Sequence, residues 1–239
     1  MKFYLSIISL IILSIGCQNK EIKIPVSNAK GIQEMSNFSE IWMFLEVEAN
    51  DTILKLNDNN LIGSTNWIFN IDKSLKLKKI IPVLSQFQEK RIKKSMHNIQ
   101  GFQNYLSYSD TISKVLSFVD ISKVKFHFDT IQSKQLLLKN LDYYKNYNNI
   151  HVSFGINQYY INENTIQKEE FFKTLEEYID FTKTDLPTLV HLNFNQLLSY
   201  QEYVYIKTTM LATKDLSFNI DINESIFDAN KIPECGCEL

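Results

Sequence analysis

The sequence predicts an α+β fold made of two small modules in tandem, each of the β-β-α-β-α-β type, with the first module irregular. Segments of strand periodicity alternate with amphipathic helical segments through residues 150–221, and a weak repeat relates residues 107–129 to residues 199–221. The 239 residues are 44% hydrophobic and include only six Gly and four Pro. The chain therefore has enough apolar side chain to form ordered cores.

The N-terminus has the features of a secretion signal that ends in a cysteine. Lys2 supplies a positive charge, and residues 3–15 form an uncharged apolar run, shorter than the roughly 20 residues that a transmembrane helix needs. The segment Ser14-Ile15-Gly16-Cys17 resembles the lipobox of bacterial lipoproteins, with Ser14 where leucine is usual. The resemblance implies that residues 1–16 are removed and that Cys17 receives a diacylglycerol. The alternative is that Cys17 is a small apolar residue in a signal that is cleaved elsewhere.

Changes in composition divide the mature chain into a tether, two modules and a tail. A polar, Tyr- and Asn-rich stretch over residues 140–149 separates the two modules. The expected ranges are residues 17–40 for the lipidated tether, 41–139 for the first, diverged module, 150–221 for the second module and 222–239 for the C-terminal tail.

The second module has the clearer pattern of elements. Strands are predicted at Ile150–Phe154, Tyr159–Ile161 and Leu189–Phe194, and an amphipathic helix at Gln167–Thr182. In the first module, the pattern predicts a hairpin of residues 44–48 and 52–56, a strand at 67–71, and a helix with Pro82 in its first turn that continues to about Lys94.

Both copies of the repeat begin with a possible capping box. Ser107 is followed three residues later by Asp110, and Ser199 is followed by Glu202. In this motif the hydroxyl accepts a hydrogen bond from a free backbone N–H at the helix start, while the acid reaches back to the cap residue. Each copy is therefore predicted to form a helix, a short turn and a strand, in that order.

Residues 150–221 resemble the periplasmic domain of the ExbD/TolR family. The segments that carry the resemblance are IHVSF, YYINENTI, EEFFKTLEEY, PTLVHLNF, SYQEYVYIKTTML and LSFNID. The resemblance implies a soluble module that dimerises and contacts the cell wall or partner proteins. Family members also carry an acidic residue in a transmembrane helix, whereas residues 3–15 contain no acid. Proton coupling is therefore not implied for this chain.

The C-terminal segment Cys235-Gly236-Cys237 is the main candidate for chemistry. With Cys17 lipidated, the two remaining thiols can form a strained disulfide in an oxidising compartment. Metal binding is an alternative, although two thiolates are half of a tetrahedral zinc site. Thiol exchange is another, although the flanking Glu234 and Glu238 disfavour the thiolate. No residue is assigned a catalytic or cofactor-binding role, and His127 and His191 are predicted as structural residues of strands.

These observations predict a protein of the bacterial cell envelope, lipid-anchored in the inner or outer membrane and facing the periplasm. The expected function is that of a non-enzymatic adaptor or binding module for envelope proteins or the cell wall, without a cofactor. The alternative is a thiol-dependent redox or metal-binding protein that uses Cys235 and Cys237. With a net charge of −2, the chain lacks the basic field that nucleic-acid binding requires.

Overall fold

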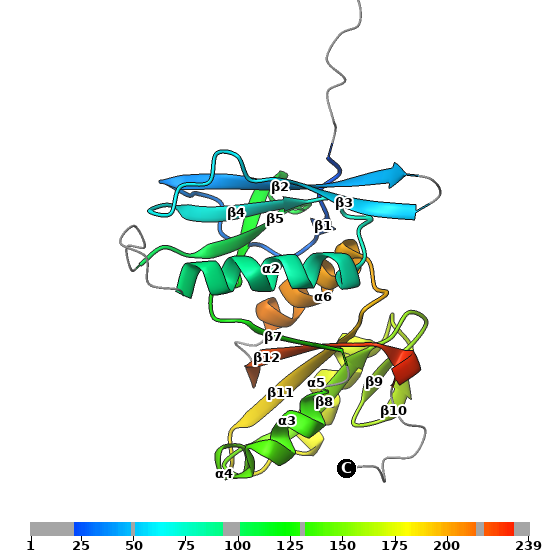
Figure 1. Cartoon of the computed structure of the whole chain (residues 1–239). Coiled ribbons are helices and arrows are strands. Elements are labelled where there is room, and N and C mark those ends of the chain that lie inside the picture. The colour runs from blue at the N-terminus through cyan, green and yellow to red at the C-terminus, as the bar shows by residue number, and fades with distance from the viewer. Residues whose placement is uncertain (1–21, 49–50, 93–100, 130–131, 214–217, 232–239) are drawn as a thin grey trace, which may run out of the picture.

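The protein is an α+β fold in which two mixed sheets enclose a layer of helices (Figure 1). The computed structural model describes residues 22–48, 51–92, 101–129, 132–213 and 218–231. Buried apolar residues of both sheets belong to one continuous cluster. Among the described residues, no helix combines the length and the apolar character needed to cross a bilayer.

The first sheet has the strand order β1-β5-β4-β2-β3, and β6 also pairs with β5. Helix α2 (Leu77–Ile92) packs on one face through residues such as Phe87, which contacts the rings of Trp67 and Phe69. The six strands are β1 (Val26–Ser27), β2 (Phe38–Glu48), β3 (Asp51–Asn57), β4 (Asn66–Ile71), β5 (Asn104–Asp110) and β6 (Val115–Asp120).

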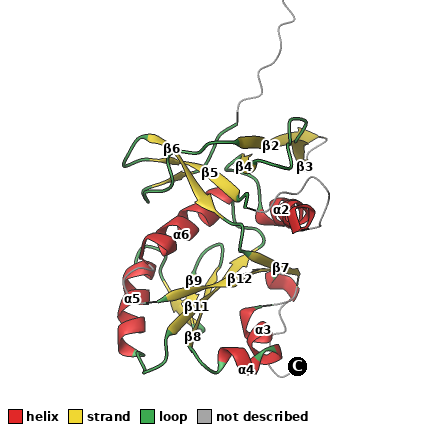
Figure 2. Cartoon of the chain, turned by 90° about the vertical axis from the view of Figure 1, so that its left-hand side faces the viewer, coloured by secondary structure: helices red, strands yellow, loops and turns green. Residues whose placement is uncertain are grey.

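The second sheet has the order β10-β9-β8-β11-β12-β7. Its strands are β7 (Lys125–Asp129), β8 (Asn148–Phe154), β9 (Tyr159–Ile161), β10 (Asn164–Ile166), β11 (Thr188–Asn195) and β12 (Asn219–Phe227). The helices are α3 (Ser133–Lys139), α4 (Leu141–Tyr144), α5 (Phe171–Phe181) and α6 (Tyr200–Thr213), followed by a short 3-10 turn at Ala229–Lys231. Helices α5 and α6 cover one face of this sheet, and α3 and α4 lie on the other (Figure 2).

The two sheets share a pattern of connections. In the first, β2 pairs with β3 as an antiparallel hairpin and with β4 in parallel, and β4 pairs in parallel with β5. The second sheet repeats these pairings. There, β8 pairs with β9 as an antiparallel hairpin and with β11 in parallel, and β11 pairs in parallel with β12. Helix α2 joins β4 to β5 as α6 joins β11 to β12, whereas α5 has no described counterpart in the first half.

Reciprocal backbone hydrogen bonds join the two halves where α2 and α6 begin. Leu77 N donates to Leu198 O (3.1 Å), and Tyr200 N donates to Leu75 O (2.8 Å). Leu75 corresponds to Leu198 and Leu77 to Tyr200 at an offset of 123 residues, so each half makes the same contact with the other. This is the isologous pattern of a two-fold dimer, formed here within one chain.

The prediction of a helix at the first repeat copy is wrong. Ser107 and Asp110 lie in β5, and β6 follows. Asp110 accepts hydrogen bonds from the backbone N–H groups of Ile112 and Ser113, so its side chain caps a strand turn instead of a helix. The second copy is confirmed as a helix start, because Ser199 and Glu202 exchange the hydrogen bonds of a capping box. The strand that closes each copy is present, as β7 and β12, but the repeat at 92 residues aligns β5 and β6 with helix α6.

Other predicted elements are confirmed with changed limits. The hairpin, the strand at 67–71 and the strands and helices of the second half are present. Helix α2 begins five residues before Pro82, which lies inside it instead of in its first turn. The range expected for the first module includes β7, which belongs to the second sheet, and β12 extends beyond residue 221 into the expected tail.

The described part of the expected tether packs against the fold. Lys23 O accepts a hydrogen bond from Lys73 N (2.7 Å), β1 pairs with β5, and Ser27 Oγ bonds to Thr208 Oγ1 of α6 (2.7 Å). A Cβ at Gly31 would lie 2.2 Å from the Tyr108 hydroxyl, so glycine allows the chain to pass here. Residues 22–32 therefore form an arm that joins the first sheet to α6.

Candidate functional site

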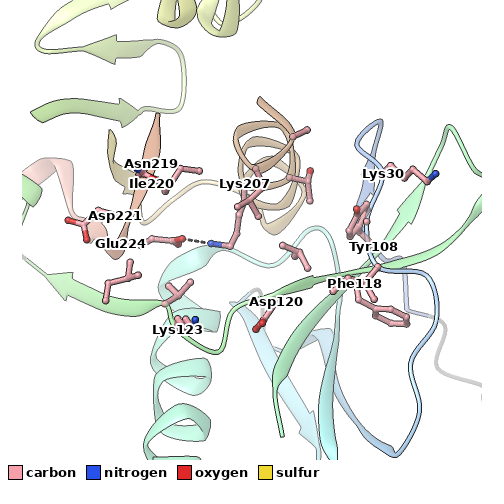
Figure 3. Close-up of a pocket in the computed structure, with 18 of the residues that line it drawn as sticks. Lys30, Tyr108, Phe118, Asp120, Lys123, Lys207, Asn219, Ile220, Asp221 and Glu224 are labelled. Atoms are coloured by element: carbon pink, nitrogen blue, oxygen red, sulfur yellow. Dashed lines mark hydrogen bonds and ion pairs between the residues drawn. The ribbon is translucent and has the colours of Figure 1, made fainter. Parts of the chain in front are cut away.

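A groove of about 840 Å³ lies between the two halves of the protein (Figure 3). One wall comes from the N-terminal arm, β5 and β6, and the other from α6 and β12. Apolar side chains form much of the lining, and they include Phe118, Val119, Val124, Leu211, Phe218 and Ile220. The volume is in the range of sites that bind small molecules.

A buried ion pair lies at the groove. Lys207 on α6 extends to Glu224 on β12, and their side chains are only 5% and 1% exposed (Figure 3). The hydroxyl of Tyr203, one turn before Lys207, donates a hydrogen bond to the other oxygen of Glu224 (2.7 Å). Both charges are therefore neutralised inside the protein, and this pair fixes α6 to the second sheet.

The first residues of β12 present an open strand edge to the groove. On one side, Asn219 and Ile220 pair with β11, and the register then shifts before Glu224. On the other side, β7 pairs with β12 only from Asn223 onward. Within the described ranges, no strand covers residues 219–222 on that side, and these four residues line the groove. Free backbone N–H and C=O groups at such an edge can pair with an added strand.

Behind this edge, Asp221 is the centre of a buried polar network. Asp221 Oδ2 bonds to His191 Nδ1 (2.8 Å) and accepts a hydrogen bond from the Tyr144 hydroxyl (2.9 Å). Asp221 Oδ1 accepts hydrogen bonds from the backbone and the side-chain amide of Asn223 (both 3.0 Å). The Asn223 side-chain oxygen in turn bonds to His127 Nε2 (2.9 Å). The network joins α4, β7, β11 and β12.

Both ring nitrogens of His191 are hydrogen-bonded. Its Nδ1 faces the Asp221 carboxylate and its Nε2 faces the side-chain oxygen of Asn149 (2.9 Å). The Asn149 amide nitrogen donates to two backbone carbonyls, which fixes the orientation of this side chain. Because both ring nitrogens of His191 are hydrogen-bonded, the orientation of the ring is fixed from both sides.

The same contacts shift the ionisation of Asp221 and Tyr144. Burial raises the pKa of Asp221, but the hydrogen bonds from His191, the Asn223 backbone and Tyr144 outweigh burial, and the net pKa is lowered. The pKa of Tyr144 is raised, first by burial and then by the charge of Asp221. Asp221 is therefore a carboxylate and Tyr144 a neutral donor at neutral pH.

A serine–histidine pair adjoins the network without forming a catalytic triad. Ser133 Oγ bonds to His151 Nδ1 (2.7 Å), and the His151 ring stacks on His191 with centroids 4.7 Å apart. The carboxylate of Asp221 bonds to His191 and not to His151. A triad requires the carboxylate to orient the histidine that contacts the hydroxyl. The arrangement is that of a structural layer under α3.

The pH dependence of stability is predicted from His151. Burial, and then the charge of His191, lower its pKa to about 3, against about 6.5 in an unfolded chain. As the pH falls below about 6.5, the unfolded chain binds a proton that the folded protein does not bind. We expect the free energy of unfolding to decrease by about 1–2 kcal/mol between about pH 7.5 and pH 5, measured by urea denaturation.

The variant His151→Gln tests the source of this dependence. It removes the titrating ring, so the decrease over the same pH interval should become smaller. Asp221 contributes little there, because its lowered pKa affects stability only below its ordinary value of 3.8. An unchanged pH dependence in His151→Gln would show that other groups cause it.

The cysteines predicted as sites, Cys17, Cys235 and Cys237, lie outside the described residues, and their roles stay predictions. His127 and His191 lie in strands β7 and β11, as predicted, and both are hydrogen-bonded. No local sequence pattern reveals the groove or the network, because partners such as His191 and Asp221 are 30 residues apart. In the part of the chain that the structure describes, no group of three or more His, Cys, Asp or Glu could hold a metal ion.

Comparisons with known protein families, with curated proteins and with solved structures give no match to this chain.

Proposed function

We propose that the protein is a lipid-anchored component of the bacterial cell envelope that binds a segment of another envelope protein in the groove between its two halves. Lipidation at Cys17 supplies the anchor, as the lipobox-like sequence indicates. The resemblance of residues 150–221 to the ExbD/TolR periplasmic domain supports the assignment to the envelope. It also supports a fold of two such modules in tandem.

The observation that carries the proposal is the open edge of β12 inside a groove with apolar walls. An extended segment that pairs with residues 219–222 would gain backbone hydrogen bonds. Alternate side chains of that segment would contact Val119, Leu211 and other apolar groups of the lining. The buried charges of Lys207 and Glu224 neutralise each other. The lining also contains Lys30, Asp120 and Lys123, so polar contacts at the groove would accompany strand pairing and apolar contact.

Site-specific photocrosslinking in intact cells tests this function. Ile222 lines the groove and is 45% exposed, so a photoreactive residue placed there can reach a bound segment. The matched control is Phe181 at the end of α5, which is 88% exposed and does not line the groove. We expect a discrete crosslinked protein from position 222 and none from position 181.

Two outcomes would contradict the proposal. If both positions give the same products, or if position 222 gives none, the groove does not bind a protein segment. Deletion of residues 234–239 separates this function from the thiol-based alternative, because it removes Cys235 and Cys237 and should leave the crosslink unchanged.

A further inference from the structure

An aromatic strip follows the outer face of β2. We define it as Phe38, Trp42 and Phe44, which alternate with inward residues such as Ile41 and Met43. The rings of Trp42 and Phe44 are nearly parallel, with an interplanar angle of 13° and centroids 6.3 Å apart. Phe38 is 46% exposed, and the other two side chains are half-buried. An exposed acid, Glu40, occupies the outward position between Phe38 and Trp42, so three of these four outward positions are aromatic.

No described helix covers this face of the first sheet. Helix α2 packs on the opposite face, where Ile41 and Met43 join the core. Figures 1 and 2 both show the first sheet at the end of the molecule remote from the second sheet, with α2 and α6 on its inner side. The outer face also carries the ion pair Glu46–Lys55, with a distance of 3.4 Å.

The chain enters the fold beside this strip. Lys23 N donates to Asp72 Oδ2 (3.3 Å), and Asp72 N donates to the backbone oxygen of Met43 (3.0 Å). Met43 directly precedes Phe44, so two consecutive contacts connect the first described residues to the strip. Figures 1 and 2 place this start of the described chain at the same end of the molecule as the first sheet.

The chain between the proposed anchor and the fold is short. Cys17 and Ile22 are separated by five residue steps, which span at most about 18 Å when fully extended. A diacylglycerol on Cys17 lies in the bilayer, so its attachment point is at the membrane surface. Ile22, where the described chain begins, must therefore stay within about 18 Å of that surface.

We propose that the aromatic strip docks on the lipid bilayer and holds the protein with its first sheet against the membrane. This inference rests on the lipid anchor of the proposed function. Aromatic side chains are favoured at the level of the lipid headgroups, where apolar ring surface leaves water and polar groups remain hydrated. Glu40, Glu46 and Lys55 would lie among the headgroups beside the rings. The groove, on the inner side of the first sheet, then remains accessible from the periplasm.

Quenching of tryptophan fluorescence by brominated lipid tests the docking. The chain contains two Trp residues, and Trp67 is only 1% exposed, under α2. The lipidated full-length protein is purified in detergent and reconstituted into vesicles of phosphatidylcholine with brominated acyl chains or with ordinary ones. We expect brominated vesicles to remove up to about half of the emission, because one of the two indoles contacts the lipid.

Two variants complete the experiment. Trp42→Phe keeps Trp67 and an aromatic ring in the strip, so its emission should not respond to bromine. Cys17→Ala keeps both indoles and loses the anchor, so its emission should also be unchanged. If Trp42→Phe does not fold, the comparison of wild-type protein with Cys17→Ala still isolates the response that depends on the anchor.

The outcomes distinguish the docking from the anchor. Mass spectrometry of the purified protein shows whether Cys17 carries lipid. A lipidated, vesicle-bound protein whose emission is insensitive to bromine overturns the docking and leaves the anchor in place. Absence of lipid on Cys17 overturns both the anchor and the docking, because the 18 Å restraint is then lost.

Discussion

Replacing Glu224 with leucine is expected to lower the free energy of unfolding by about 3–5 kcal/mol, because the Lys207 ammonium group is then buried without a counter-charge. The Lys207 side chain is 5% exposed, so water does not replace the lost carboxylate. The Tyr203 hydroxyl loses its acceptor as well. Urea denaturation monitored by circular dichroism measures the change.

The double variant Lys207→Met/Glu224→Leu identifies the cause. It removes both charges and keeps similar side-chain volume. It should therefore lose much less free energy of unfolding than the single variants Lys207→Met and Glu224→Leu lose together. Glu177→Leu is the matched control, since Glu177 forms an exposed pair with Lys173 at 3.7 Å and should cost less than about 0.5 kcal/mol. Additive losses in the double variant would show that the pair is not coupled.

Replacing Asp221 with leucine is expected to cost about 3–4 kcal/mol, because His191, Tyr144 and Asn223 all lose their common acceptor. The two ring contacts of His191, with Tyr144 and His151, leave little room for these donors to turn toward water. The measurement is the midpoint of urea unfolding at neutral pH.

Asp221→Asn is expected to cost less than Asp221→Leu, because the amide oxygen can still accept a hydrogen bond from His191. Asp180→Asn, at an exposed position of α5, serves as the control and should change stability by less than about 0.5 kcal/mol. A loss below about 1 kcal/mol in Asp221→Leu would mean that the network contributes little to folding.

Local sequence signals predicted the second half of the fold well. The strands at residues 150–154 and 189–194 are predicted by their apolar content, and the Ser199–Glu202 capping box forms within four residues of chain. These features depend on neighbouring residues only.

At Ser107 and Asp110 the local sequence signal predicted the wrong element. A short acid three residues after a serine can cap a helix or a strand turn, and both arrangements satisfy free backbone N–H groups. This segment is a strand because it pairs with β4 on one side and with β6 on the other. Tertiary contacts therefore overrode the local signal.

The sequence by itself determined the α+β class, most element positions and the lipobox-like N-terminus, because these depend on periodicity and short motifs. Only the tertiary structure decided that β7 belongs to the second sheet and that the two halves meet through reciprocal contacts between Leu75–Leu77 and Leu198–Tyr200. It also decided that Lys207 meets Glu224 and that His191 meets Asp221. Partners separated by 17 to 30 residues are selected by chain packing, and no local pattern specifies them.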